Sequence, residues 1–105
     1  MLVVDDSPTE THILVHALAN AGYRVEAASN GEEGVSAARR LHPDLILMDV
    51  VMPVLNGFQA TRQLHKDAET ASIPVIMVTT KDQDTDRTWG LRQGAQDYLV
   101  KPIDT

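Results

Sequence analysis

Five polar side chains each come directly after a short apolar run: Asp5 and Asp6, Asp49, Thr79 and Lys101. A few carboxylates, completed by water and phosphate oxygens, are ligands that suit Mg²⁺. A carboxylate can also attack a phosphoryl group and form an aspartyl phosphate, a reaction that depends mainly on alignment and charge neutralisation. The residue types therefore indicate phosphoryl transfer assisted by a divalent cation.

The apolar runs alternate with stretches that have helical spacing. We expect strands at residues 2–4, 24–28, 44–49, 73–79 and 97–100, and helices at 7–21, 30–41, 58–64 and 82–92. Strands that alternate with helices predict a parallel sheet with helices on both faces. The expected fold class is therefore α/β, with a doubly wound, five-stranded parallel sheet.

A helix-start signature follows the first strand. Ser7 can accept hydrogen bonds from free N–H groups, Pro8 suits the first helical position, and Glu10 is placed to complete a capping box. An apolar stripe follows, which we expect to pack on the sheet: Ile13, Leu14, Ala17, Leu18 and Ala21. His12 and His16 have metal-ligand spacing, but they lie opposite this stripe, and we interpret them as a solvated helix face.

The carboxyl ends of parallel strands share one edge of the sheet, where ligands bind. We therefore expect Asp5, Asp6, Asp49, Thr79 and Lys101 to meet there. Asp49 is the best candidate nucleophile because it follows the middle strand. One acid at a strand end could be a simple cap. Three acids with a hydroxyl and an ammonium are harder to explain in that way, because carboxylates at close range repel one another.

Composition excludes several classes of protein. The chain has 105 residues, 43% of them hydrophobic and 23% charged, which is typical of one soluble globular domain. The net charge of −6 argues against partners such as nucleic acid or an anionic membrane. No apolar run approaches the roughly 18 residues of a membrane span. The chain has no cysteine, which excludes disulfides and fits a reducing compartment, so we expect a cytoplasmic location.

In this order and at this spacing, the motifs resemble the receiver domain of two-component response regulators, the CheY-like family. The matching segments are residues 3–7, 47–49, 52–53, 56–57, 78–79 and 94–102. The resemblance covers residues 1–105 as a single receiver domain and implies a flavodoxin-like sheet in the strand order 2-1-3-4-5. Surface segments at 56–64, 67–74 and 78–83 further resemble the stand-alone regulators of type IV pilus twitching motility (PilH-like).

The resemblance implies a phosphorylation site with a metal ion. Asp49 resembles the phosphoacceptor. Asp5 and Asp6 look like the acid pair that holds Mg²⁺ together with Asp49, and the backbone carbonyl of Val51 completes the ligands; Mn²⁺ can substitute. The implied function is a signalling switch, not a turnover enzyme, with self-phosphorylation and autodephosphorylation at Asp49 only. The implied partners are a sensor histidine kinase or phosphotransfer protein and a downstream protein target.

The resemblance also implies how the signal leaves the site. Lys101 resembles the phosphate-contacting lysine, and its bond to Pro102 is expected to be cis. Thr79 resembles the switch hydroxyl and Tyr98 the switch aromatic. Phosphate on Asp49 is expected to draw the Thr79 hydroxyl toward it, so that Tyr98 can move into the space vacated. Trp89, on a nearby expected helix, is interpreted as a packing residue, with a role in partner binding left open.

One departure from the family concerns the fifth helix with which receivers normally end. This chain stops at Thr105, so we expect a C-terminally truncated domain in which one sheet face is covered only by the first helix. Such a face would leave apolar surface exposed.

Three other functions remain open from the sequence. An aspartate-nucleophile phosphatase usually has a second acid two residues after the nucleophile, where this chain has Val51. Flavin binding could use the hydroxyls that follow the first strand, but Asp5 and Asp6 would repel the flavin phosphate. A purely structural interaction domain of the same fold would have no need of the acids.

Overall fold

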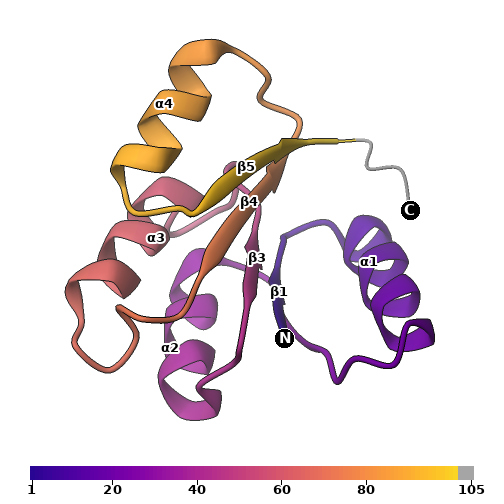
Figure 1. The fold of residues 1–105 in the computed structure, drawn as a ribbon. Helices are drawn as coiled ribbons and strands as arrows, with labels where there is room; N and C mark the ends of the chain where they lie inside the picture. The colour runs from indigo at the N-terminus through magenta and orange to yellow at the C-terminus, as the bar shows by residue number, and fades with distance from the viewer. Residues whose placement is uncertain (102–105) are drawn as a thin grey trace.

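Strands and helices alternate along the chain in the computed structural model, which describes residues 1–101 (Figure 1). The strands are β1 (Leu2–Val4), β2 (Glu26–Ala28), β3 (Ile46–Met48), β4 (Val75–Thr79) and β5 (Asp97–Val100). The helices are α1 (Pro8–Asn20), α2 (Gly31–Leu41), α3 (Gly57–Lys66) and α4 (Asp84–Arg92). All five strands pair in parallel in the order β2-β1-β3-β4-β5, which confirms the expected fold class and strand order.

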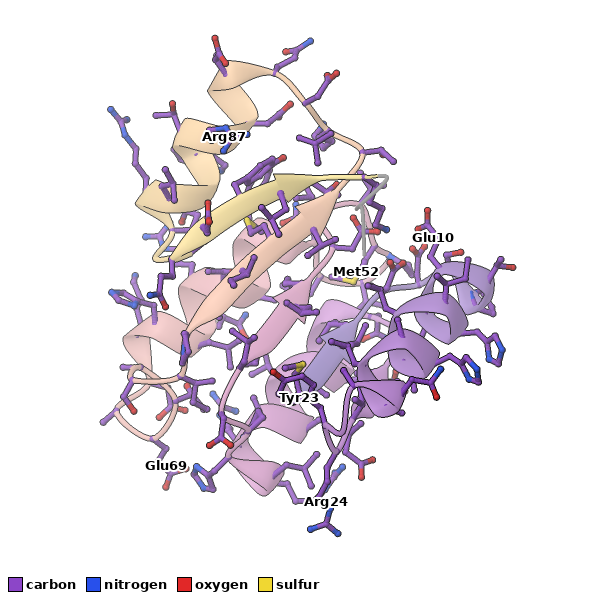
Figure 2. The ribbon with its side chains drawn as sticks, turned by 45° about the vertical axis from the view of Figure 1, so that its right-hand side comes forward. Glu10, Tyr23, Arg24, Met52, Glu69 and Arg87 are labelled. Atoms are coloured by element: carbon purple, nitrogen blue, oxygen red, sulfur yellow. The ribbon has the colours of Figure 1, made fainter. Side chains whose placement is uncertain are left out.

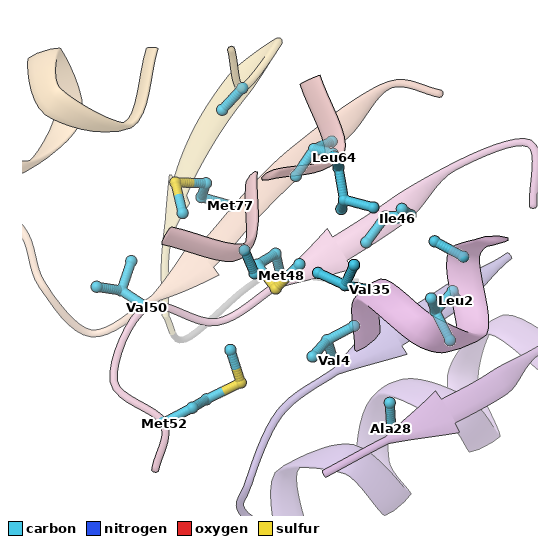
Figure 3. Close-up of a cluster of buried hydrophobic side chains, with 14 of the residues drawn as sticks. Leu2, Val4, Ala28, Val35, Ile46, Met48, Val50, Met52, Leu64 and Met77 are labelled. Atoms are coloured by element: carbon cyan, nitrogen blue, oxygen red, sulfur yellow. The ribbon is translucent and has the colours of Figure 1, made fainter. Parts of the chain in front are cut away.

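The helices divide between the two faces of the sheet. Figure 1 shows α2, α3 and α4 on one side and α1 on the other. Alternate strand residues point toward α2 and α3, where they form the buried core seen in Figure 3. This core includes Leu2, Val4, Ile46, Met48, Met77, Val35 and Leu64. Within residues 1–101, no helix combines the length and apolar character needed to cross a bilayer.

The α1 face of the sheet is covered incompletely. Ile13 is 60% exposed, so its expected place in the core is wrong. Leu99, on the same face of the sheet, is 39% exposed. In the part of the chain that the structure describes, α1 is the helix on this face, and it contacts mainly β1 and β2. Leu99 on β5 therefore lies beyond its reach, as expected for a face covered by one helix.

Polar caps begin three of the helices. Asn30 and Asn56 cap α2 and α3, and Asn56 forms a full capping box with Gln59. At α1, Ser7 Oγ accepts from the Glu10 N–H at 3.3 Å, as predicted. The reciprocal half of the expected box is wrong, because the Ser7 N–H donates to Asp5 Oδ1 at 2.9 Å instead. The Glu10 carboxylate is thereby left without its expected partner in the cap.

Candidate functional site

Three carboxylates lie together at the carboxyl edge of the sheet. One oxygen from each of Asp5, Asp6 and Asp49 lies within 4.8 Å of the others. Strand register accounts for this proximity, because Val4 of β1 pairs with Met48 of β3, and Asp5 and Asp49 are the next residues along the two strands. Asp5 and Asp49 are buried and Asp6 is exposed, so the cluster opens to solvent on one side. Three hard oxygen donors with an open side fit Mg²⁺, which keeps several waters when bound.

The Asp49 carboxylate is held in a fixed orientation. Its Oδ1 accepts from the Val50 N–H at 2.7 Å, and its Oδ2 lies 3.5 Å from Lys101 Nζ. Burial raises the pKa of Asp49 above its usual value, and the nearby charge of Asp5 raises it further. The charge of Lys101 and hydrogen bonds from the Thr79 hydroxyl and the Val50 N–H partly oppose this shift in pKa. The ionised form of Asp49 is therefore disfavoured by its surroundings, and a bound cation would stabilise it.

Gly57 allows α3 to begin directly against the strand end that carries Asp49. A Cβ at Gly57 would overlap the carbonyl oxygen of Asp49, so only glycine fits this close approach. The Gly57 N–H donates to the Val50 carbonyl at 2.8 Å and closes the loop over the site. The sequence pattern left residues 50–57 between an expected strand and an expected helix, so it placed Gly57 outside the helix that Gly57 begins and did not predict this packing role.

Lys101 supplies the positive charge at the site. Its Nζ donates to Asp5 Oδ2 at 2.7 Å and to Glu10 Oε2 at 2.5 Å, as well as approaching Asp49 Oδ2. Its backbone N–H donates to the Thr79 carbonyl at 2.8 Å, which fixes the strand end. Burial alone would lower the pKa of Lys101, but the hydrogen bonds to Asp5 and Glu10 and the charge of Asp49 more than offset it and raise the pKa. Lys101 therefore stays charged.

Glu10 is a site residue that sequence reasoning missed. Its position three residues after Ser7 was interpreted only as part of a capping box. The signal that could have identified it is geometric, because the first turn of a helix that follows β1 must lie beside the strand ends.

Thr79 and Tyr98 lie on the neighbouring strands β4 and β5, where Tyr98 pairs with Met77 and Thr79 with Val100. Thr79 is fully buried, and its Oγ1 accepts from the Lys81 N–H at 3.4 Å. The Tyr98 hydroxyl donates to the Lys81 carbonyl at 2.8 Å. Lys81 thus connects the two residues through its backbone.

Tyr98 is already inside the protein, with 1% of its surface exposed. The expected movement of Tyr98 into the space vacated by Thr79 stays a prediction, and it would start from a side chain that is already buried. Burial, followed by the charge of Asp86, raises the pKa of Tyr98 to about 12. The Arg87 guanidinium lies 5.7 Å from the ring centroid and donates to the Tyr98 carbonyl at 3.0 Å. Trp89, also on α4, is 48% exposed, so about half of its surface is not packed against the protein.

Three further predictions concern residues around the site. The side chain of Val51 is exposed, and the ligand role of its carbonyl stays a prediction. Pro102, and with it the expected cis bond, lies outside the described residues. His12 and His16 are exposed and stack with ring centroids 5.8 Å apart. Their exposure is in line with the interpretation of a solvated helix face.

Comparisons with known proteins agree with this geometry. Residues 1–105 match a family model described as the response regulator receiver domain. Over 104 residues the chain is 64% identical to Protein PilH of Pseudomonas aeruginosa. The aligned region covers 99% of this chain and 86% of that protein.

Solved structures show the same likeness. The chemotaxis protein CheY4 of Vibrio cholerae superposes with a TM-score of 0.92 at 35% identity, covering 98% of this chain and 86% of that one. The receiver domain of the sensor histidine kinase PA1611 of Pseudomonas aeruginosa superposes with a TM-score of 0.90 at 36% identity, covering 98% of this chain and 84% of that one. The latter structure holds a magnesium ion coordinated in its active site cleft.

Proposed function

The chain belongs to the response regulator receiver family, and we propose that it is a phosphorylation-dependent switch in which Asp49 accepts the phosphoryl group. The observation that carries this proposal is the environment of Asp49. It is a buried carboxylate at the end of the middle strand, with Lys101 Nζ 3.5 Å from its Oδ2 and the acids Asp5 and Asp6 beside it.

Asp49 Oδ2 is the better placed of its two oxygens for attack, because Oδ1 already accepts from the Val50 N–H. In the transfer, a bond forms between Oδ2 and phosphorus while the bond from phosphorus to a donor imidazole nitrogen breaks. The imidazole leaves with that electron pair. The ammonium of Lys101 contacts one phosphoryl oxygen, and the Thr79 hydroxyl donates to another.

A divalent cation completes the proposed site. Asp5, Asp6, Asp49 and the carbonyl of Val51 would hold it, and it would neutralise charge on the phosphoryl oxygens when bound. Mg²⁺ is the proposed ion, and Mn²⁺ is proposed as a substitute. In support, the donor set is made of oxygens only and is open to solvent at Asp6.

The output of the switch is a change in affinity for a protein partner. We propose a histidine kinase or a phosphotransfer protein as the donor, in the cytoplasm, and a separate downstream target. Similarity to PilH favours pilus-based twitching motility as the process. Turnover as a phosphatase is not proposed, because Val51 occupies the position at which a general acid is needed.

The test is incorporation of phosphate from acetyl phosphate in the presence of Mg²⁺, measured by mass spectrometry. We expect one phosphoryl group on the wild-type chain and none on Asp49→Asn. Asp44→Asn is the matched control, because Asp44 is exposed and lies before the opposite end of the same strand. Full labelling of Asp49→Asn, or no labelling of the wild-type chain, would refute the assignment.

A further inference from the structure

Glu10 reaches the site because the helix cap does not need its side chain. Its backbone N–H bonds to Ser7 Oγ, which places Glu10 in the first turn of α1 (Figure 2). The N–H of Ser7, which a capping box would assign to Glu10, is bonded by Asp5 instead. The Glu10 carboxylate is thus directed to Lys101 Nζ at 2.5 Å.

The Lys101 ammonium has three hydrogens to donate, and their partners are unequal. Asp5 Oδ2 at 2.7 Å and Glu10 Oε2 at 2.5 Å are close, whereas Asp49 Oδ2 lies at 3.5 Å. The two close contacts fix Nζ at 3.5 Å from Asp49 Oδ2, so Lys101 can move closer to Asp49 only if one of them loosens.

The burial of the two partners indicates which of the Lys101 contacts can loosen, the one with Asp5 or the one with Glu10. The Asp5 side chain is only 2% exposed, so it cannot turn toward water. The Glu10 side chain is 41% exposed and can exchange Lys101 for solvent. Glu10 is also absent from the group of carboxylates that fits a metal ion. Its contact with Lys101 is thus the one that can be given up without disturbing the metal site.

We propose that Glu10 is a positioning residue that holds Lys101 away from Asp49 in the unphosphorylated state and so slows phosphoryl transfer. The inference rests on the proposed function and adds a regulatory contact to the same site. Glu10 also adds a negative charge beside Asp5, Asp6 and Asp49, which strengthens cation binding. Removing that charge therefore has opposite effects on two measurable quantities.

The test uses Glu10→Gln, which keeps the size of the side chain and removes its charge. At saturating Mg²⁺, we expect phosphorylation by acetyl phosphate to become faster by roughly twofold to fivefold, the range for partly exposed ion pairs. The affinity for Mg²⁺ alone, measured by calorimetric titration, is expected to fall by about twofold because one nearby negative charge is lost.

Two controls separate this role from others. Glu32→Gln makes the same change in the first turn of α2, at an exposed residue, and should alter neither quantity. In a Lys101→Met background, Glu10→Gln should no longer accelerate labelling, because the positioning acts through the ammonium. Acceleration that persists there would mean simple repulsion of the anionic donor and would overturn the proposal.

Other outcomes are equally decisive. Slower labelling together with weaker Mg²⁺ binding in Glu10→Gln would mean that Glu10 assists phosphoryl transfer, and it would overturn the proposal that Glu10 slows it. Equal rates in the wild-type chain and Glu10→Gln would refute the role of Glu10 and leave the proposed function intact. Absence of labelling in the wild-type chain would refute the proposed function and the inference with it.

Discussion

Asp49→Asn should stabilise the protein in the absence of a divalent cation. The substitution removes a buried negative charge but keeps an oxygen that can accept from the Val50 N–H, so the geometry of the loop is preserved. Burial and the charge of Asp5 both raise the pKa of Asp49, which means that its ionised form is disfavoured in the folded state.

The magnitude follows from the charges around Asp49. Oxygens of Asp5 and Asp49 within 4.8 Å repel by at least about 3.5 kcal/mol at an effective dielectric constant of about 20. Lys101 at 3.5 Å offsets this by about 4.7 kcal/mol on the same basis. The attraction exceeds this lower bound on the repulsion by about 1.2 kcal/mol. The cost of burial and the screened repulsion from Asp6 act in the opposite direction, and the raised pKa of Asp49 shows that they outweigh the difference. We therefore expect a gain in the free energy of unfolding of about 1–2 kcal/mol, the size of a typical single-site effect.

The pH dependence has a definite sign. Because the folded-state pKa of Asp49 is raised above its usual 3.8, the wild-type chain loses stability as the pH rises from that value through the raised pKa. The advantage of Asp49→Asn should thus be full above the raised pKa and should disappear as the pH falls toward 3.8.

Urea unfolding followed by circular dichroism checks this, with Asp44→Asn as the exposed control. Added Mg²⁺ should stabilise the wild-type chain more than Asp49→Asn, so the difference between their free energies of unfolding should become smaller. If Asp49→Asn is no more stable than the wild-type chain at neutral pH without metal, the electrostatic reasoning is refuted.

Two further predictions concern the metal and the output. Asp6→Ala should weaken Mg²⁺ binding at least tenfold, because few carboxylates hold the ion; calorimetric affinity equal to that of the wild-type chain would place the metal elsewhere. Beryllium fluoride with Mg²⁺, as a mimic of phosphate on Asp49, should change the emission of Trp89, and Thr79→Ala should still accept phosphate but lose most of that change. An identical Trp89 response in both proteins would contradict a path through Thr79.

The fold and the convergence of the site could be predicted because they depend on pattern. Apolar runs at period two or as short continuous segments mark strands, and parallel strands bring residues such as Asp5 and Asp49 to one edge whatever their exact ends. The strand ends themselves were predicted less well, since β3 covers only Ile46–Met48 of the expected 44–49.

What the sequence did not predict depends on competition between partners. Glu10 satisfies the pattern of a capping box, but the Ser7 N–H has a second acceptor, Asp5, and the pattern cannot say which acid it takes. The bond from the Tyr98 hydroxyl ends on a backbone carbonyl, which has no signature in the residue types. Ile13 follows the helical period, but its burial depends on what else covers the sheet.

The contacts that leave the site form one continuous path, and this path explains why Thr79 is the residue to change. The Lys101 N–H bonds to the Thr79 carbonyl at 2.8 Å, and the Thr79 hydroxyl accepts from the Lys81 N–H. The Lys81 carbonyl in turn accepts from Tyr98, whose ring lies against α4 at Gly90. If the Thr79 hydroxyl turned toward a phosphate on Asp49, it would release the Lys81 N–H. Movement of the Lys81 backbone would then reach the Tyr98 ring and its packing against α4, without any need for Tyr98 to enter from outside. A few kcal/mol suffice to shift the balance between two arrangements of α4. Thr79→Ala, which removes one hydroxyl, should therefore still accept phosphate but lose most of the change in Trp89 emission.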